Sequence, residues 1–418
     1  MRYKDARKRV GRGGECMKRA ISGVSLLAVA ICLLASPKRI AAEEGAAALQ
    51  WLQPSDSRLQ WINVADWESR SDGWQPVRVP KAWRDKWPQR TAGRALSTGG
   101  VALRVKTDSK HIVLRLTFID TPEALGNTPE SRWEIGRPPY FDVYRDGKYL
   151  QSVPAKIVFY QQEVRLLESN TSESAGAAQE AEYSILFPHY YRNAEVSLAG
   201  VGVDENARLD APAPNRLPVV MFHGDSITHG HGVTSPRETY VWQTCEMAHC
   251  LPLNLGFGGS GWADLPVADY IASRNDWDIL VVMLGTNSFG GADSAGKTET
   301  AAQYGKKYDS FLGIIRARFP NKPILCITPI LSENDLVSRR NKNGELPQDY
   351  RNAIQTTVEE RQKSDKHLYF LDGLKLINDP LFLMVIDHVH PNSAGSQRMA
   401  QGIAEMLRPL LAQSAASR

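Results

Sequence analysis

Beyond residue 218 the chain alternates between short apolar runs and longer amphipathic stretches. The apolar runs lie at 219–222, 251–255, 279–284, 324–327 and 368–371. The amphipathic stretches between and after them lie at 237–249, 263–274, 300–319, 348–364 and 393–411. Short apolar strands that alternate with helices are typical of a parallel sheet covered by helices on both faces. The pattern therefore predicts an α/β domain over 218–411, followed by a tail at 412–418.

Residues 97–203 follow a different period, in which apolar and polar positions alternate. The apolar residues at 112, 114, 116 and 118 share one face of a predicted strand, and further candidate strands lie at 140–144, 156–159, 183–187 and 195–201. Asp146-Gly147 is a pair favoured in type I′ hairpin turns. Short alternating strands with turn signals between them predict an antiparallel β-sandwich over 97–203. Residues 168–182 are predicted to be an exposed loop, and the proline-rich 204–217 a linker.

Residues 43–96 show neither period, and they hold six of the ten tryptophans. These are Trp51, Trp61, Trp67, Trp74, Trp83 and Trp87. Such a cluster can stack on sugar rings, or it can anchor a meandering segment to a core. We favour anchoring, because buried aromatic side chains dominate core energetics. The segment is therefore predicted to be irregular and to pack on the sandwich.

Charge is unevenly distributed along the 418 residues. The formal net charge is +4, but residues 1–42 alone carry +8 and the rest of the chain carries −4. A slightly acidic body gives no electrostatic reason to expect nucleic acid or an anionic membrane as a partner. Apolar residues make up 42% and charged residues 23%, which is ordinary for a folded chain and excludes a disordered or collagen-like protein.

The basic N-terminal segment has the features of an export signal. Met17-Lys18-Arg19 precede an apolar stretch over 21–35, and small residues follow at 40–42. This order is typical of a secretory signal peptide, and the stretch is shorter than the ~20 residues of a membrane-spanning helix. We therefore predict that 1–42 is a signal peptide and that the mature protein is secreted or periplasmic, without a membrane partner. An uncleaved anchor is the alternative.

Two of the five cysteines, Cys16 and Cys32, fall in the predicted signal peptide. The remaining Cys245, Cys250 and Cys326 are odd in number and lack metal-ligand spacing. Cys245 and Cys250 lie five residues apart on one predicted helix, which points them to different faces and makes a mutual disulfide awkward. We expect this pair to be small buried apolar residues.

Glycines and polar residues follow four of the predicted strands in the α/β region. His223-Gly224-Asp225-Ser226 closes the first strand, and a glycine-rich segment at 256–261 follows the second. Asn287 comes shortly after the third strand, and Asp387-His388-Val389-His390 follows the last. Ligands of open parallel sheets bind beyond the carboxyl ends of the strands. We therefore look for the chemistry in these four segments.

Together these segments, in their order and spacing, resemble the four blocks of the SGNH (GDSL-type) hydrolases. The resemblance implies a three-layer α/β/α, flavodoxin-like domain with a five-stranded parallel sheet. Residues 140–144, 187–202 and 218–262 look like the SGNH subgroup, carbohydrate-esterase-like, that carries an N-terminal β-sandwich of jelly-roll type. The sequence departs from that subgroup at Tyr140-Phe141, where its signature has a glycine, and at His223, where a tyrosine is common.

The resemblance also implies roles for five residues in acyl transfer, which needs a nucleophile, a base and donors for an oxyanion. Ser226 is the nucleophile, His390 is its base, and Asp387 orients the imidazole. The backbone N–H groups of Ser226 and Gly259 and the side-chain amide of Asn287 form the oxyanion hole. No cofactor or metal is expected.

Each residue also has a plainer interpretation. Gly259 could serve a turn, Asn287 could cap the following segment, and Asp387 with His390 could belong to a surface turn. Five histidines crowd the region (His223, His229, His231, His388 and His390) and could instead suggest zinc, but zinc would leave Ser226 and the oxyanion residues without a role. His223 and Trp262 are weaker candidates for substrate contact, and Trp262 could equally fill the core.

The leading hypothesis is a secreted serine esterase that removes short acyl groups, most simply acetyl, from a carbohydrate, either a small molecule or a polysaccharide. An O-acetyltransferase, or a lipase or thioesterase, could use the same triad, because the acceptor depends on how well the site excludes water. A non-catalytic glycan-binding protein is the alternative outside catalysis. The oligomeric state cannot be deduced from these patterns.

Overall fold

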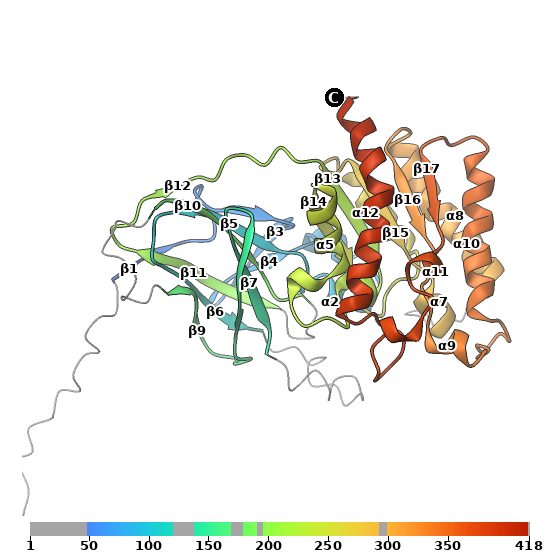
Figure 1. Cartoon of the computed structure of the whole chain (residues 1–418), viewed down its shortest axis with the longest axis horizontal. Coiled ribbons are helices and arrows are strands. Elements are labelled where there is room, and N and C mark those ends of the chain that lie inside the picture. The colour runs from blue at the N-terminus through green and yellow to red at the C-terminus, as the bar shows by residue number, and fades with distance from the viewer. Residues whose placement is uncertain (1–47, 120–137, 169–178, 190–194, 292–298, 417–418) are drawn as a thin grey trace, which may run out of the picture. The chain divides into compact units, whose positions relative to one another are not determined.

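A five-stranded parallel sheet forms the centre of the C-terminal half of the chain, in the order β14-β13-β15-β16-β17 (Figure 1). Its strands are β13 (Val219–Gly224), β14 (Leu251–Gly256), β15 (Ile279–Met283), β16 (Ile324–Ile327) and β17 (Leu368–Leu371). Each of the five predicted apolar runs is one of these strands. Because the order reverses next to β13, the first of them, this is the flavodoxin-like arrangement. The predicted fold class is confirmed.

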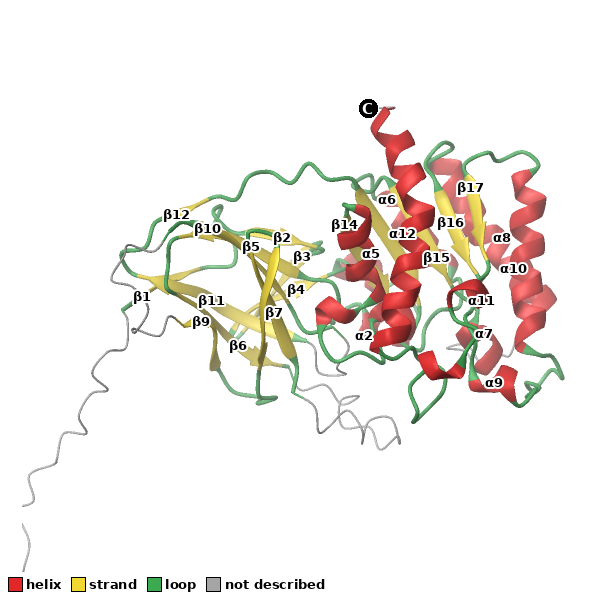
Figure 2. Ribbon diagram, in the orientation of Figure 1, coloured by secondary structure: helices red, strands yellow, loops and turns green. Residues whose placement is uncertain are grey.

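Helices cover both faces of this sheet (Figure 2). On one face, Met221, Leu280 and Val282 pack against α6 (Leu265–Ser273), α8 (Ala301–Arg318) and α10 (Pro347–Gln362). On the other face, Val220, Phe222 and Val281 pack against α5 (Tyr240–Ala248) and α12 (Ser393–Ala416). All five helices lie where they were predicted, but α12 continues to Ala416, so the prediction of a tail from residue 412 is wrong. The short helices α4 (Ser226–His229), α7 (Thr286–Gly290), α9 (Glu333–Leu336) and α11 (Gly373–Leu376) were not predicted.

The N-terminal half of the described chain consists of two antiparallel sheets that enclose a second core. One sheet has the order β3-β4-β11-β6-β9, with β1 paired to β11, and the other has the order β12-β5-β10-β7-β8, with β2 paired to β5. The strands of the predicted sandwich region are β5 (Ala102–Thr107), β6 (His111–Phe118), β7 (Tyr140–Arg145), β8 (Lys148–Pro154), β9 (Gln162–Glu168), β10 (Ala181–Leu186) and β11 (Val196–Asp204), and β12 (Leu209–Asp210) follows them. Leu103, Leu114 and Phe141 lie in the core between the sheets.

The computed structural model describes residues 48–119, 138–168, 179–189, 195–291 and 299–416. The predicted signal peptide and most of the predicted loop over 168–182 lie outside the described residues. Among the described helices, none combines the length and the apolar character needed to cross a membrane.

The prediction that residues 43–96 are irregular is wrong. The segment contributes four strands, β1 (Leu49–Leu52), β2 (Gln60–Ile62), β3 (Asp66–Arg70) and β4 (Gly73–Val77), and the short helices α1 (Lys81–Arg84) and α2 (Gln89–Arg94). Of these strands, β1 and β4 pair with β11, far along the chain, and β3 pairs with β4. Local periodicity does not reveal such pairing.

Several tryptophans of this segment serve as anchors, whereas Trp74 is exposed. The rings of Trp61 and Trp67 meet edge to face, with centroids 4.9 Å apart, against the sandwich core. Trp87 packs against Phe257 and Tyr270 of the α/β region, and its indole N–H donates to the carbonyl of Pro266. The segment therefore contacts both the sandwich core and the α/β region.

The hairpin predicted at Asp146-Gly147 joins β7 to β8, and both residues have left-handed backbone angles, with φ of 50° and 75°. The strand predicted at 156–159 is wrong, because this stretch lies between β8 and β9 outside the ladders. Within this stretch, the backbone carbonyl of Val158 accepts a hydrogen bond from the backbone N–H of Phe118. The adjoining strands β8 and β9 carry the pairing instead.

Candidate active site

The side chains of Ser226, His390 and Asp387 form one hydrogen-bonded chain at the carboxyl end of the parallel sheet. Ser226 Oγ lies 2.6 Å from His390 Nε2. The other ring nitrogen, His390 Nδ1, lies 2.7 Å from Asp387 Oδ2. Ser226 is the first residue of α4, directly after β13, whereas the other two lie on the loop before α12. A hydroxyl, an imidazole and a carboxylate in this order can carry out nucleophilic catalysis.

The turn from β13 into α4 fixes the position of the serine. A Cβ atom at Gly224 would lie 2.0 Å from Thr228 Oγ1, so α4 folds this closely against the strand only with glycine there. The Asp225 side chain accepts a hydrogen bond from the N–H of Ile227, at 2.9 Å, and so caps α4. Asp225 therefore shapes the turn that holds Ser226, as its position in the sequence suggests.

Asp387 is held as a carboxylate by the groups around it. Burial favours the neutral acid, but hydrogen bonds from the His390 ring and from the backbone N–H groups of Val389 and His390 outweigh burial and lower the pKa of Asp387 to about 2. An ionised carboxylate at Nδ1 keeps the proton on that nitrogen and leaves Nε2 to accept the proton of Ser226.

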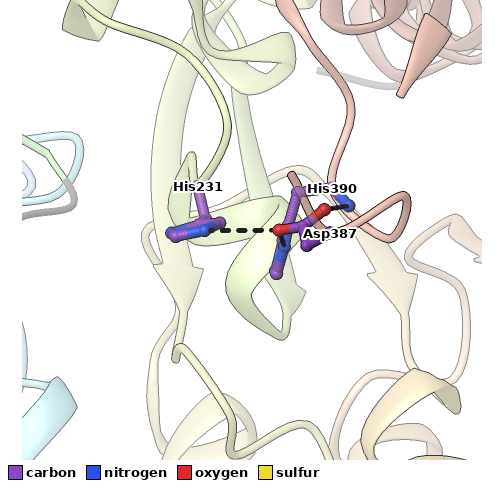
Figure 3. Close-up of side chains that lie close together, drawn as sticks. All are labelled: His231, Asp387 and His390. Atoms are coloured by element: carbon purple, nitrogen blue, oxygen red, sulfur yellow. Dashed lines mark hydrogen bonds and ion pairs between the residues drawn. The ribbon is translucent and has the colours of Figure 1, made fainter. Parts of the chain in front are cut away.

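A second histidine touches this pair (Figure 3). The rings of His231 and His390 have centroids 4.0 Å apart, and His231 Nε2 lies 3.8 Å from Asp387 Oδ2. His231 is 4% exposed, so it supports the inner side of the imidazole rather than lining a cleft. No sequence pattern indicates this contact, because His231 and Asp387 lie on separate loops.

His231, Asp387 and His390 also form a group that could hold a metal ion, since one ligand atom from each lies within 4.8 Å of the others. Both nitrogens of His390 are within hydrogen-bonding distance of other side chains, one of Ser226 and one of Asp387. A metal ion would have to replace at least one of these bonds. The donor set therefore fits the hydrogen-bonded chain better than a metal site.

Two of the predicted oxyanion residues, Gly259 and Asn287, follow the strands on either side of β13. Gly259, with φ of 68°, belongs to the loop after β14, and Asn287 lies in α7 after β15. Asn287 Oδ1 accepts a hydrogen bond of 2.8 Å from the N–H of Gly261, which leaves its amide N–H groups as the donor side. A Cβ atom at Gly261 would lie 2.7 Å from Asp225 Cβ. The glycine loop is therefore packed closely between Asn287 and the turn that carries Ser226.

His223 and Trp262 need a correction, because both side chains are buried, at 2% and 3% exposure. His223 Nδ1 is bonded to the carbonyl of Leu255, and its ring stacks on Phe311. Burial lowers the pKa of His223 to about 4, so it is a neutral core residue. Neither side chain has a surface for substrate, and we assign packing roles to both.

Arginines of the N-terminal segment contact β14 and the glycine-rich loop that follows it, which carries Gly259. Sequence reasoning missed these contacts. Arg90 Nη1 donates to the carbonyl of Gly259 at 3.4 Å, and Arg94 Nε donates to that of Gly258 at 3.2 Å. The buried Arg78 donates to the carbonyls of Asn254 and Gly256, each at 3.0 Å. These bonds span more than 160 residues, and no local motif points to them.

A small cavity of about 20 Å³ adjoins the site. Ile227, Thr286 and Val389, which line it, are the sequence neighbours of Ser226, Asn287 and His390. The rest of the lining includes Phe289, Ile330, Leu331 and Tyr350. A cavity of this size has room for about one water molecule. It is mostly apolar and small.

An α/β domain of flavodoxin-like order, with these residues at the ends of its strands, has the architecture of an SGNH-type acylhydrolase. Residues 222–398 match the GDSL-like lipase/acylhydrolase family. The chain therefore carries a GDSL-like lipase/acylhydrolase domain, and it is an enzyme of the esterase/acylhydrolase class. No curated protein matches the sequence.

Solved structures share the whole two-part fold. The salicylyl-acyltransferase SsfX3 from a tetracycline biosynthetic pathway matches with a TM-score of 0.72 and 23% identity, over 87% of this chain and 98% of that one. A family two carbohydrate esterase from Clostridium thermocellum, solved in complex with cellohexaose, matches with a TM-score of 0.57 and 16% identity. This match covers 84% of this chain and 99% of that one. An acetyl xylan esterase from the rumen bacterium Butyrivibrio proteoclasticus matches with a TM-score of 0.56 and 14% identity, over 88% of this chain and 99% of that one.

Proposed function

We propose that this protein is an exported serine esterase that removes acetyl groups from carbohydrates through an acyl-serine intermediate. The observation that carries the proposal is the chain of two short hydrogen bonds from Ser226 through His390 to Asp387. A serine hydroxyl needs a base within hydrogen-bonding reach to become a nucleophile. Here the base has a carboxylate behind it that remains ionised at neutral pH.

In the first half of the reaction, His390 Nε2 takes the proton of Ser226 while Oγ attacks the carbonyl carbon of the ester. The resulting oxyanion accepts hydrogen bonds from the N–H groups of Ser226, Gly259 and the Asn287 side chain. Asp387 stabilises the imidazolium. The intermediate then collapses: the bond to the sugar oxygen breaks, and His390 returns its proton to that oxygen.

In the second half, water takes the place of the sugar. His390 removes a proton from the water as it attacks the acyl-serine, and the same proton passes to Ser226 Oγ when the acyl–oxygen bond breaks. The products are the free hydroxyl of the sugar, the carboxylic acid and the original enzyme. No external cofactor is needed to balance the reaction.

The cavity beside the triad supports a short acyl group. Its volume of about 20 Å³ and its lining by Ile227, Thr286 and Val389 suit a methyl group next to the reacting carbonyl better than a long chain. The fold shared with two carbohydrate esterases supports a carbohydrate as the alcohol component of the ester substrate. The predicted signal peptide supports export.

Acyl transfer to an acceptor other than water is the second candidate, since the same fold occurs in a salicylyl-acyltransferase. The two activities share the acyl-serine and differ in the group that attacks it. Exclusion of water from the acyl-enzyme would favour transfer. The identity of the acceptor decides between them.

The proposal is tested with acetylated xylan, acetylated monosaccharides and p-nitrophenyl esters of increasing acyl length, with Ser226→Ala as the control. We expect acetate release from the carbohydrates, a rate that falls with acyl length, and loss of turnover in the variant. Preference for long chains would favour a lipase or thioesterase. Glycan binding by a wild type that lacks turnover would favour a binding protein. Acetyl transfer to an added sugar, faster than hydrolysis, would favour the transferase.

A further inference from the structure

Cys245 and Cys250 lie side by side, contrary to the expectation that they point to different faces of a helix. The helix α5 ends at Ala248, and His249 takes a left-handed conformation with φ of 61°. This turn brings the N–H of Cys250 to within 3.1 Å of the carbonyl of Cys245. In such a helix ending the two residues at these positions pack against each other.

The two side chains also lie close enough to interact. Both cysteines are free and buried, at 2% and 5% exposure, and burial together with the neighbouring Cys250 thiol raises the pKa of Cys245. The third described cysteine, Cys326, is fully buried in strand β16, away from this pair. Two adjacent thiols, held by the same helix ending, are the arrangement that a disulfide requires.

A cavity gives this pair an approach from outside the two cores. It has a volume of about 300 Å³, and Cys245 and Cys250 line it together with Trp242 and Glu246 of α5 and Tyr144 of the sandwich. The cavity therefore adjoins the pair, although both cysteine side chains are buried. Cys250 precedes the amino end of β14, whereas Ser226 follows the carboxyl end of β13, so the pair lies at the other end of the sheet from the triad.

We propose that Cys245 and Cys250 are a redox modification site that forms an intramolecular disulfide by exchange with a small-molecule disulfide such as oxidised glutathione. The cross-link joins the end of α5 to the start of β14. It does not depend on the proposed function, because neither cysteine belongs to the catalytic chain.

The exchange proceeds in two displacements. The thiolate of one cysteine attacks a sulfur of the reagent, which breaks the reagent's S–S bond, forms a mixed disulfide and releases one reagent thiol. The second cysteine then attacks the mixed disulfide, which forms the Cys245–Cys250 bond and releases the second reagent thiol. The protein loses two electrons and two protons, and the reagent gains them.

The test uses the full-length protein, which is first reduced and unfolded in denaturant so that burial does not keep glutathione from the thiols. The protein is then refolded in a buffer of reduced and oxidised glutathione. Free thiols are alkylated after the refolded protein has been returned to denaturant, so that the fully buried Cys326 also reacts, and the protein is cut after Glu246, which separates the two cysteines. We expect the two resulting peptides to stay joined until a reductant is added, and Cys326 to be alkylated. We also expect the unfolding midpoint of the oxidised protein to be a few degrees higher than that of the reduced protein.

Cys326→Ala is the matched control and should keep the cross-link, whereas Cys245→Ala should leave Cys250 as a free thiol or a glutathione adduct. The double variant Cys245→Ala, Cys250→Ala should lose the redox-dependent shift in midpoint, and its esterase activity should equal that of the wild type. Alkylation of both cysteines in wild-type protein refolded in the glutathione buffer, or a cross-link from either one to Cys326, would overturn the proposal.

Discussion

The histidines near the end of β13 fall into two groups with opposite surroundings. His390 bonds to an ionised carboxylate on one side and to a hydroxyl on the other. His189 and His223, by contrast, are buried and bonded to backbone carbonyls, and burial lowers the pKa of each to about 4. The difference teaches that a histidine acquires an acid–base role from its partners, whereas burial among apolar and backbone groups keeps it neutral and structural.

The carboxylates show the same contrast. Hydrogen bonds from His390 and from backbone N–H groups lower the pKa of Asp387. Glu195, between the sandwich strands, is 7% exposed, and burial raises its pKa to about 7 despite a hydrogen bond from Gln75. The charged form of Asp387 is thus stabilised, whereas the charged form of Glu195 is destabilised.

The largest effect is expected for His390→Ala. Without the base, Ser226 keeps its proton, and we expect kcat to fall by about 10⁶-fold. Steady-state hydrolysis of a p-nitrophenyl ester measures this, and circular dichroism checks that the fold is retained. A loss of less than tenfold would mean that another group is the base.

Asp387→Asn comes next. The amide cannot stabilise the imidazolium and can leave the ring in the wrong tautomer, so we expect a loss of about 10⁴-fold in kcat with little change in KM. A rise in KM alone, with kcat preserved, would instead assign Asp387 to substrate binding.

Asn287→Ala tests the oxyanion donor. One lost donor typically costs about 10²–10³-fold in kcat. Gly261 would lose its bond to Oδ1 at the same time, so Asn287→Asp serves as a second variant: it keeps an acceptor for Gly261 but supplies no donor to the oxyanion. If Asn287→Asp retained full activity, the amide would have only a structural role.

Glu195→Gln gives a pH test of the sandwich. Because the folded pKa lies above the ordinary value, the folded protein binds more protons between pH ~4.5 and ~7, and its stability falls as pH rises through this window. The shift corresponds to about 3 kcal/mol. Urea unfolding at pH 5 and pH 8 measures the free energy of unfolding, and we expect its decrease between these pH values to be absent in the variant. If the variant shows the same decrease as the wild type, a group other than Glu195 causes it.

The smallest effect on catalysis is expected for His223→Phe. The substitution leaves the carbonyl of Leu255 without its partner, which costs about 1–3 kcal/mol of stability. Turnover should remain within about threefold of the wild type, well below the loss expected on removing a catalytic donor. A loss as large as that for His390→Ala would break the contrast between the two groups of histidines.

The parallel sheet could be predicted because each of its strands is a locally apolar run followed by its own helix. The strands β1 to β4 could not. β1 and β4 pair with β11, far along the chain, β2 is only three residues long, and β3 is mostly exposed, without a regular alternation. The four segments that carry Ser226, Gly259, Asn287 and His390 could be located from their order after the strands. The contacts of His231 and Arg90 could not, because loops from distant segments create them.

The central claim is that Ser226 is a nucleophile activated by His390. A fluorophosphonate probe tests it most directly, since the probe forms a covalent bond with an activated serine, and peptide mapping locates the adduct. We predict a single adduct on Ser226 that is absent in Ser226→Ala, nearly absent in His390→Ala and retained in His223→Phe. Esterase activity that persists without labelling of Ser226, or labelling that is unaffected by His390→Ala, would contradict the account.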